Sequence, residues 1–302
     1  MNPLSQTKQD STIILDSKIE PFSQLAHFWE NAPLIYNDAI FIADSHFMPL
    51  NTTLNDESKN ASIALLNYFK SLLDSVQNIP SQIFLMGDIA HLLFGGISSS
   101  HKTHKELLEL IISLSAHSQI WWFEGNHDFN LVWIGALKKH FNRIFIVPRN
   151  DQPKAFLFES NGAKKRILLA HGDLFLNTKY ELYIRCMRTQ FLQFCMRFID
   201  FVTFGNLYHN IIAKVNRKHI RVGKAQMSEF APLRICAYEK YMRKKLNIDD
   251  LVNLDSIFDA VIEGHFHIGQ TYSNGAVYVS LPSFYINGSI FAIQSLPDNK
   301  IT

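Results

Sequence analysis

The sequence predicts an α/β fold built on a largely parallel sheet, and two observations lead to this prediction. Short apolar runs of four or five residues recur along the chain, and each runs directly into a cluster of Gly, Asp, His or Asn. Runs of this length and composition are typical of strands that are buried on both faces. Segments with apolar residues at helical spacing lie between the runs, and this alternation indicates parallel βαβ units.

Five strands are expected, over residues 39–43, 83–86, 120–123, 167–170 and 258–262. Helices are expected over 61–76, 103–114 and 129–141, where apolar residues recur every three or four positions. Near the C-terminus, 276–281 and 289–293 are expected to form a closing hairpin with Asn287-Gly288 as its turn. Residues 1–35 carry no strong pattern, and we expect an irregular extension there.

Length and composition are those of an ordinary globular protein. The chain has 302 residues, 47% hydrophobic and 19% charged, which excludes disordered, collagen-like and coiled-coil classes. Three cysteines without a CxxC pair favour a reducing compartment and no disulfide framework. Because we find neither a secretory signal nor a run of 18 apolar residues, we expect a cytoplasmic protein without a transmembrane helix.

Charge is unevenly distributed along the chain. Residues 177–246 carry 14 Lys and Arg but only four acidic residues, for a net charge of +10. The rest of the chain carries 15 basic and 23 acidic residues. This asymmetry indicates an anionic partner for residues 177–246, either a nucleic acid, a phosphorylated substrate or a membrane surface.

Polar side chains follow the predicted strands at their carboxyl ends, where open α/β sheets bind ligands. They combine carboxylate, imidazole and amide groups, a set that suits Mn²⁺, Fe²⁺ or Zn²⁺. Two ions that share a bridging carboxylate would use all of them and would activate a water for attack on phosphorus. Taken singly, each His could be a core or surface residue and each Asp a helix cap. The seven candidate ligands are Asp44, His46, Asp88, Asn126, His171, His265 and His267.

The order of these motifs resembles the calcineurin-like metallophosphoesterase superfamily. The motifs are Asp44-Ser45-His46, Gly87-Asp88, Gly125-Asn126-His127-Asp128, His171-Gly172 and Gly264-His265-Phe266-His267. The resemblance spans about 38–293 and implies a four-layer α/β/β/α sandwich with two divalent metal ions. It implies that Asp44, His46 and His267 hold one ion, that Asn126, His171 and His265 hold the other, and that Asp88 bridges them.

The same resemblance implies roles for the two residues after Asn126. His127 would protonate the leaving oxygen or stabilise charge in the transition state. Asp128 would orient the His127 ring by accepting a hydrogen bond from it. Asp128 could also cap the helix expected over 129–141, and both roles can hold together.

A long insertion separates His171 from His265, which lie 94 positions apart. Within it, Gln190, Gln193, Arg197 and Asp200 fall on one narrow helical stripe, and the remaining residues of 190–202 are largely apolar. The apolar face could pack in the core, cover a lipid chain or lie in a membrane interface. A basic stretch follows, with Lys214, Arg217, Lys218 and Arg221, and it suits phosphate groups or an anionic bilayer.

A closer resemblance is to the UDP-2,3-diacylglucosamine pyrophosphohydrolases of lipid A synthesis. It rests on His171-Gly172-Asp173, the following Tyr- and Arg-bearing helix, the aromatic stretch and the basic stretch. It implies a helical lid over the acyl chains, Mn²⁺ as the usual metal, and release of UMP and 2,3-diacylglucosamine 1-phosphate. The sequence departs from that family at His127, where Arg is usual, and at Phe266, where Thr is usual. Candidates for contact with substrate phosphate are Arg185, Arg188, Lys214, Arg217, Lys218 and Arg221.

These observations divide the chain into an extension (1–35), a metallophosphoesterase core (36–176 and 247–302) and a lid insertion (177–246). We expect a nucleotide-activated glycolipid as substrate and an anionic membrane surface as partner, with the protein held at the inner membrane face. Three alternatives stay open, a phosphoesterase acting on another nucleotide, phosphodiester or phospholipid, nucleic-acid cleavage by a similar dinuclear centre, and a scaffold without activity. No nucleic-acid motif is recognisable, and no obligate protein partner is inferred.

Overall fold

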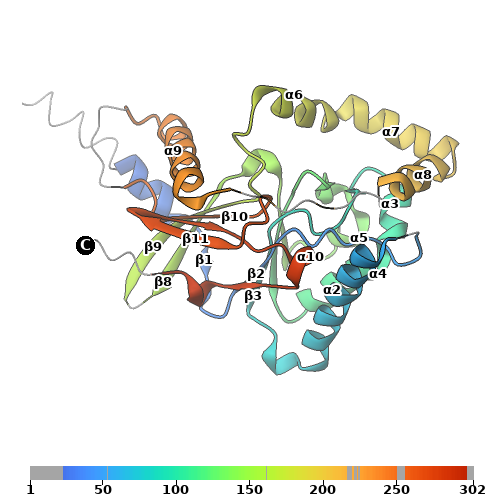
Figure 1. Ribbon diagram of the computed structural model, residues 1–302, viewed down its shortest axis with the longest axis horizontal. Coiled ribbons are helices and arrows are strands. Elements are labelled where there is room, and N and C mark those ends of the chain that lie inside the picture. Colours follow the sequence, from blue (N-terminus) through green and yellow to red (C-terminus); the bar gives the residue numbers. More distant parts are fainter. Residues whose placement is uncertain are drawn as a thin grey trace, which may run out of the picture.

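Two β-sheets packed face to face form the centre of the protein in the computed structural model (Figure 1). The structure describes residues 23–52, 54–160, 162–215, 220, 223, 225–249 and 256–297. Apolar side chains from both sheets interdigitate between them, among them Phe41 and Phe84 from one sheet and Phe156 and Ile262 from the other. The predicted α/β class is therefore confirmed.

The first sheet has five strands in the order β13-β2-β3-β5-β7. Four of them are parallel, β2 (Ile40–Ile42), β3 (Gln82–Leu85), β5 (Gln119–Phe123) and β7 (Ile144–Val147). The edge strand β13 (Phe291–Ala292) runs antiparallel to β2. Because β2, β3 and β5 are parallel and adjacent, the residues that follow them meet at one edge of this sheet.

The second sheet has six strands in the order β1-β8-β9-β10-β12-β11. The central strands β9 (Ala163–Ala170), β10 (Ala260–Glu263) and β12 (Ala276–Ser280) are parallel. The strands β8 (Lys154–Ser160) and β11 (Gln270–Asn274) pair antiparallel with β9 and β12, and β1 (Leu34–Ile35) lies parallel to β8.

Helices cover the outer faces of both sheets, which completes a four-layer α/β/β/α arrangement (Figure 1). On the first sheet, α2 (Asp56–Asp74) and α4 (Lys105–Ser115) bury Leu65, Phe69 and Leu107. On the second sheet, α9 (Met227–Lys245) and the helical segment 23–30 bury Trp29, Tyr238 and Met242. Residues 23–35 are thus a helix and an edge strand rather than the irregular extension expected, and 1–22 lie outside the described residues.

Short elements fill the connections between these layers. They are β4 (Leu93–Phe94), β6 (Asp128–Phe129), α3 (Ser98–Thr103), α5 (Gly135–Lys138), α10 (Phe284–Asn287), η1 (Val76–Asn78), η2 (Leu131–Trp133), η3 (Arg149–Asp151) and η4 (Ile293–Ser295). The helix expected over 129–141 is wrong, because Asn130 adopts a left-handed φ of 56° and only short turns follow. The expected closing hairpin is also wrong, because its two segments join different sheets and Gly288 ends α10.

The segment predicted as a lid contains two structurally different parts. The helices α6 (Thr178–Met187), α7 (Gln190–Val202) and α8 (Asn206–Val215) extend as an arm from the sheets toward α3 (Figure 1). The last helix, α9, instead packs on the second sheet as part of the core. The boundaries of the expected domains stay a prediction.

Candidate metal centre

All seven candidate ligands lie where strands of the two sheets end. Asp44 and His46 follow β2, Asp88 follows β3, and Asn126 follows β5 in the first sheet. In the second sheet, His171 follows β9, and His265 and His267 follow β10. Side chains from both sheets form two groups whose donor atoms lie within 4.8 Å of one another, Asp44 with His46 and His267, and Asp88 with His171 and His265.

The backbone at these positions is strained. Asp44, His46, Asp88, His265 and His267 have positive φ values of 51°, 43°, 51°, 66° and 56°. Residues with a Cβ rarely adopt this left-handed region, and each one costs on the order of 1–3 kcal/mol. Five such residues in one place indicate that the strand ends are shaped for a function rather than for stability.

In the first group, Asp44 has one satisfied and one unsatisfied oxygen. Its Oδ2 accepts a hydrogen bond of 2.8 Å from the His265 backbone N–H. Its Oδ1 is buried without a hydrogen-bond partner among the described residues and lies 3.3 Å from Nε2 of His267. Nε2 of His46 lies 3.5 Å from the same nitrogen of His267. A carboxylate oxygen and two imidazole nitrogens therefore converge on one point.

In the second group, hydrogen bonds aim the His171 ring at Asp88. Nδ1 of His171 donates to the Met86 carbonyl at 3.0 Å, which leaves Nε2 facing Oδ2 of Asp88 at 3.6 Å and the Asn126 amide oxygen at 3.3 Å. A metal-binding His is commonly oriented in this way, with its second nitrogen held by a carbonyl or carboxylate. Oδ1 of Asp88 accepts from the His127 backbone N–H at 2.8 Å.

Two glycines allow the strand ends to approach this closely. A Cβ on Gly125 would lie 2.2 Å from the Asp88 carboxylate, and a Cβ on Gly87 would lie 2.4 Å from the His171 ring. Gly87 also has a φ of 86°, which side chains disfavour. The glycines of the Gly-Asp and Gly-Asn motifs are thus required by the packing of the ligands themselves.

Burial and neighbouring charges together set the protonation states of the candidate ligands. It lowers the pKa of His46 well below its usual value and that of His265 to about 4, so both rings are neutral and can bind a metal. Burial acts to raise the pKa of Asp88, but the His171 and His127 rings outweigh it and hold that pKa well below its usual range. Burial acts to lower the pKa of His171, but Asp88 raises it well above its usual value. Metal binding would release this proton.

The donor set fits two divalent ions. Neutral imidazoles, carboxylates and one amide oxygen are ligands of borderline ions, and the unsatisfied Asp44 oxygen is an acceptor that an ion would satisfy. The two ligand groups are direct neighbours, since the His46 backbone N–H donates to the Asp88 carbonyl at 2.8 Å and the His265 backbone N–H donates to Asp44. The individual ligand roles stay a prediction, and so does the choice of Mn²⁺.

The expected pairing of Asp128 with His127 is not formed. The Asp128 carboxylate accepts from the backbone N–H groups of Asp88, Ile89 and Gly125 at 2.8–2.9 Å and from Nε1 of Trp122 at 3.2 Å. Nδ1 of His127 is buried without a hydrogen-bond partner among the described residues. Asp128 therefore joins the loops after β3 and β5, and it does not cap a helix either, since β6 begins there.

Sequence reasoning missed two residues of the site. His91 stacks on the His127 ring, with ring centroids 4.4 Å apart and an interplanar angle of 21°. Arg234 of α9 donates to the Gly172 carbonyl and to Glu263, which are next to His171 and His265. His91 lies three positions after Asp88, a spacing that could have drawn attention to it, whereas no local signal marked Arg234.

The predicted substrate-binding residues are dispersed. Arg185 is exposed and pairs with Glu181 at 2.8 Å, and Lys214 is exposed near the end of α8. Arg188 pairs with the buried Glu124, the residue that precedes the Gly-Asn-His-Asp motif, and burial lowers the pKa of Arg188 to about 10. Arg217, Lys218 and Arg221 lie outside the described residues.

The chain is similar to known proteins in both its sequence and its fold. A family model described as calcineurin-like phosphoesterase matches residues 39–269. The chain is also similar to the crystal structure of a dimetal phosphatase from Danio rerio, with 13% sequence identity and a TM-score of 0.34. That likeness covers 81% of this chain and 87% of the other. No curated protein matches the chain.

Proposed function

The chain belongs to the calcineurin-like phosphoesterase family and is a metal-dependent phosphoester hydrolase, and from this premise we propose that its substrate is UDP-2,3-diacylglucosamine. Hydrolysis of the pyrophosphate bond would release UMP and 2,3-diacylglucosamine 1-phosphate. The observation that carries this proposal is the orientation of α7, whose apolar face points away from the protein.

The helix α7 packs on the protein through its polar stripe. The Gln193 and Asp200 side chains are buried, Asp200 accepts from the Ser99 backbone N–H at 3.2 Å, and Arg197 donates to the Gly96 carbonyl at 3.1 Å. The aromatic residues face outward, with Phe191 at 78% and Phe201 at 77% exposure. This arrangement is the reverse of an ordinary amphipathic surface helix. An exposed aromatic surface of this kind is typical of a site for a lipid or a partner.

The arm that carries this face begins beside the metal centre. Tyr180 of α6 donates to the Asp173 carboxylate at 3.3 Å, and its ring centroid lies 6.5 Å from that of His265. The Arg188 pair with Glu124 anchors the end of α6 next to Asn126. The polar metal centre and the apolar face of α7 are thus joined by α6. A substrate with its polar head at the metal centre and its acyl chains along α7 would match this arrangement.

Bound ions would supply Lewis acidity and lower the pKa of the attacking water. The residues of the chain would position the reacting groups and transfer the proton. Asp88 and His171 would hold the ions at the strand ends, and His127, which is part of neither ligand group, would deliver a proton to the leaving phosphate oxygen. The His91 ring supports the His127 ring from one side, with the two ring centroids 4.4 Å apart.

We further propose that the protein attaches to an anionic membrane surface through the outward face of α7. Among the residues that the structure describes, no helix is both long and apolar enough to cross a membrane. Aromatic side chains together with nearby Lys and Arg favour attachment in the interface plane. The exposed Phe194, Phe198 and Phe204 would enter the acyl boundary, while Lys214 would face lipid headgroups.

One assay tests the substrate. Purified protein with Mn²⁺ is given UDP-2,3-diacylglucosamine in detergent, deacylated UDP-glucosamine and a chromogenic phosphodiester, and UMP release is measured. We expect cleavage of the acylated substrate at least tenfold above that of the deacylated one. Cleavage of the chromogenic ester alone would retain the hydrolase and reject the lipid substrate.

A pair of variants tests the role of α7. Phe194→Ser with Phe198→Ser should lower activity on the acylated substrate and binding to anionic vesicles, while activity on the chromogenic ester is retained. The matched control is Leu233→Ser, which changes an equally exposed side chain on α9 (71%). Equal effects of the two changes would contradict the proposed lipid surface.

A further inference from the structure

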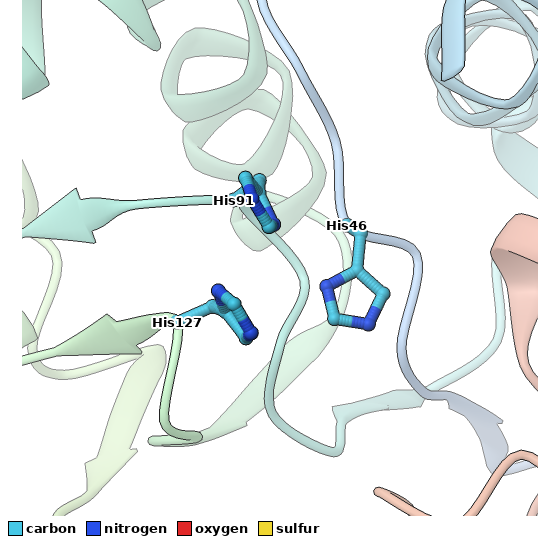
Figure 2. A group of neighbouring side chains, drawn as sticks. All are labelled: His46, His91 and His127. Atoms are coloured by element: carbon cyan, nitrogen blue, oxygen red, sulfur yellow. The ribbon is translucent and has the colours of Figure 1, made fainter. Parts of the chain in front are cut away.

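A third group of donor atoms lies beside the two ligand groups and consists only of nitrogens. His46, His91 and His127 each contribute one ring nitrogen that lies within 4.8 Å of the other two. Figure 2 shows the three rings arranged around one space, with His91 on the loop after β3 and His127 on the loop after β5. His46 and His91 are each only 4% exposed.

Four of the six ring nitrogens in this group lack the hydrogen bonds that buried histidines usually make. Nδ1 of His46, Nδ1 of His127 and both nitrogens of His91 are buried without a partner among the described residues. A buried polar atom without a partner costs about 1–3 kcal/mol, so native proteins rarely retain one without a reason. Nearby His104 shows the usual arrangement, with its nitrogens 2.9 and 3.0 Å from two backbone carbonyls.

We propose that His46, His91 and His127 form a third cation site, which binds Zn²⁺ and thereby inhibits the enzyme. Three imidazoles without a carboxylate suit zinc and do not suit Mg²⁺ or Ca²⁺, which prefer oxygen. Zn–N bonds of about 2.0–2.1 Å place tetrahedral ligands roughly 3.3 Å apart, so small side-chain rotations close the site. A water completes the coordination.

His46 can serve two sites because its two nitrogens face different groups. Nε2 lies toward His267 and Asp44, whereas the unpartnered Nδ1 belongs to the face shared with His91 and His127 (Figure 2). On binding at Nδ1, the proton of that nitrogen passes to solvent. Inhibition follows from the proposed function, because a cation on His127 removes the imidazole that would deliver the proton to the leaving oxygen.

Counting bound zinc tests the site without any substrate. Metal-free protein is saturated with Zn²⁺, and stoichiometry and affinity are measured by titration calorimetry and elemental analysis. We expect three equivalents for the wild type and two for His91→Phe, which retains a ring against His127 but has no nitrogen. The matched control His117→Ala removes an exposed histidine and should retain three. Two equivalents in the wild type, or three in His91→Phe, would overturn the site.

Activity on the chromogenic ester tests the inhibition separately. The third equivalent should slow the wild type at least tenfold, whereas the rate of His91→Phe with three equivalents should equal its own rate with two. A third ion that binds without slowing turnover would overturn the inhibitory role and leave the binding site. If His91→Phe does not fold by circular dichroism, His91→Leu gives the same test. If the protein does not cleave UDP-2,3-diacylglucosamine, the zinc count and the inhibition assay on the chromogenic ester both remain valid tests.

Discussion

Arg234 and Glu263 form a buried two-bond ion pair behind the metal centre, with Nε and Nη2 of Arg234 each 2.7 Å from a carboxylate oxygen. The same guanidinium donates to the carbonyls of Gly172 at 3.1 Å and Leu174 at 2.7 Å. It thus joins the loop after β9, which carries His171, to the end of β10, which precedes His265. The helix α9, which lies between these two strands in the sequence, therefore positions two candidate ligands.

Arg234→Lys should weaken metal binding. A lysine cannot reproduce the planar set of donors, so the two loops lose their common anchor. We expect affinity for metal to fall about 10–100-fold, as for other residues that orient ligands, with much of the turnover recovered at saturating metal. Titration calorimetry measures the affinity, and Tyr238→Phe, which removes one hydroxyl from the same network, is the milder control. A variant with lower stability and unaltered metal affinity would show a structural role only.

Asp128→Asn should destabilise the protein rather than merely reorient His127. The amide NH₂ would replace one acceptor oxygen opposite backbone N–H donors, which costs about 1–3 kcal/mol in the free energy of unfolding. Metal affinity should fall with it, because these N–H groups belong to Asp88 and Gly125. Urea unfolding of the metal-free protein measures the effect. Wild-type stability together with a large loss of turnover would restore the pairing with His127.

Asp88→Ala should remove both ions. The Asp88 carboxylate belongs to the second ligand group and also receives the His127 backbone N–H. The predicted bridging role means that each ion would lose a shared oxygen and the two groups would lose their link. Elemental analysis of the purified variant provides the test. Two tightly bound ions in Asp88→Ala would contradict the bridging role.

His127→Ala should lower turnover about 10²–10⁴-fold, the usual range for a general acid. Its metal content should equal that of the wild type, because His127 is part of neither of the two ligand groups. Both quantities are measured on the same preparation loaded with two equivalents of Mn²⁺. Loss of metal would identify His127 as a ligand of the two-ion centre instead.

His104 predicts a stability that falls in acid. Burial lowers its pKa to about 4, against the effect of two backbone carbonyls beside the ring. The unfolded side chain titrates near 6.5, so the unfolded state binds more protons between these values. The free energy of unfolding is therefore highest above pH 6.5 and loses about 2 kcal/mol from this group between pH 7 and 5. His104→Gln should reduce that loss in urea titrations with chelator, and an undiminished loss would contradict the assignment.

Much of the candidate centre could be predicted because its residues are local to strand ends. Asp44, Asp88 and His171 directly follow or lie close after apolar runs, and parallel strands bring such positions to one edge. The helix over 129–141 failed because a single left-handed residue, Asn130, interrupts a pattern that periodicity alone would continue. The hairpin prediction failed because its two segments pair with other strands, in two different sheets. Nothing in the sequence of either segment indicates which strand it pairs with.

The sequence by itself determined the ligand types, their order and the polar stripe of α7, because these depend only on chemistry and on helical or strand periodicity. Only the tertiary structure decided how those residues are used. It placed the polar stripe of α7 inward through Arg197 and Asp200, turned Asp128 to backbone donors, and brought Arg234 to Glu263. Periodicity tells which side chains share a face, but the contacts of that face depend on segments far away in the chain.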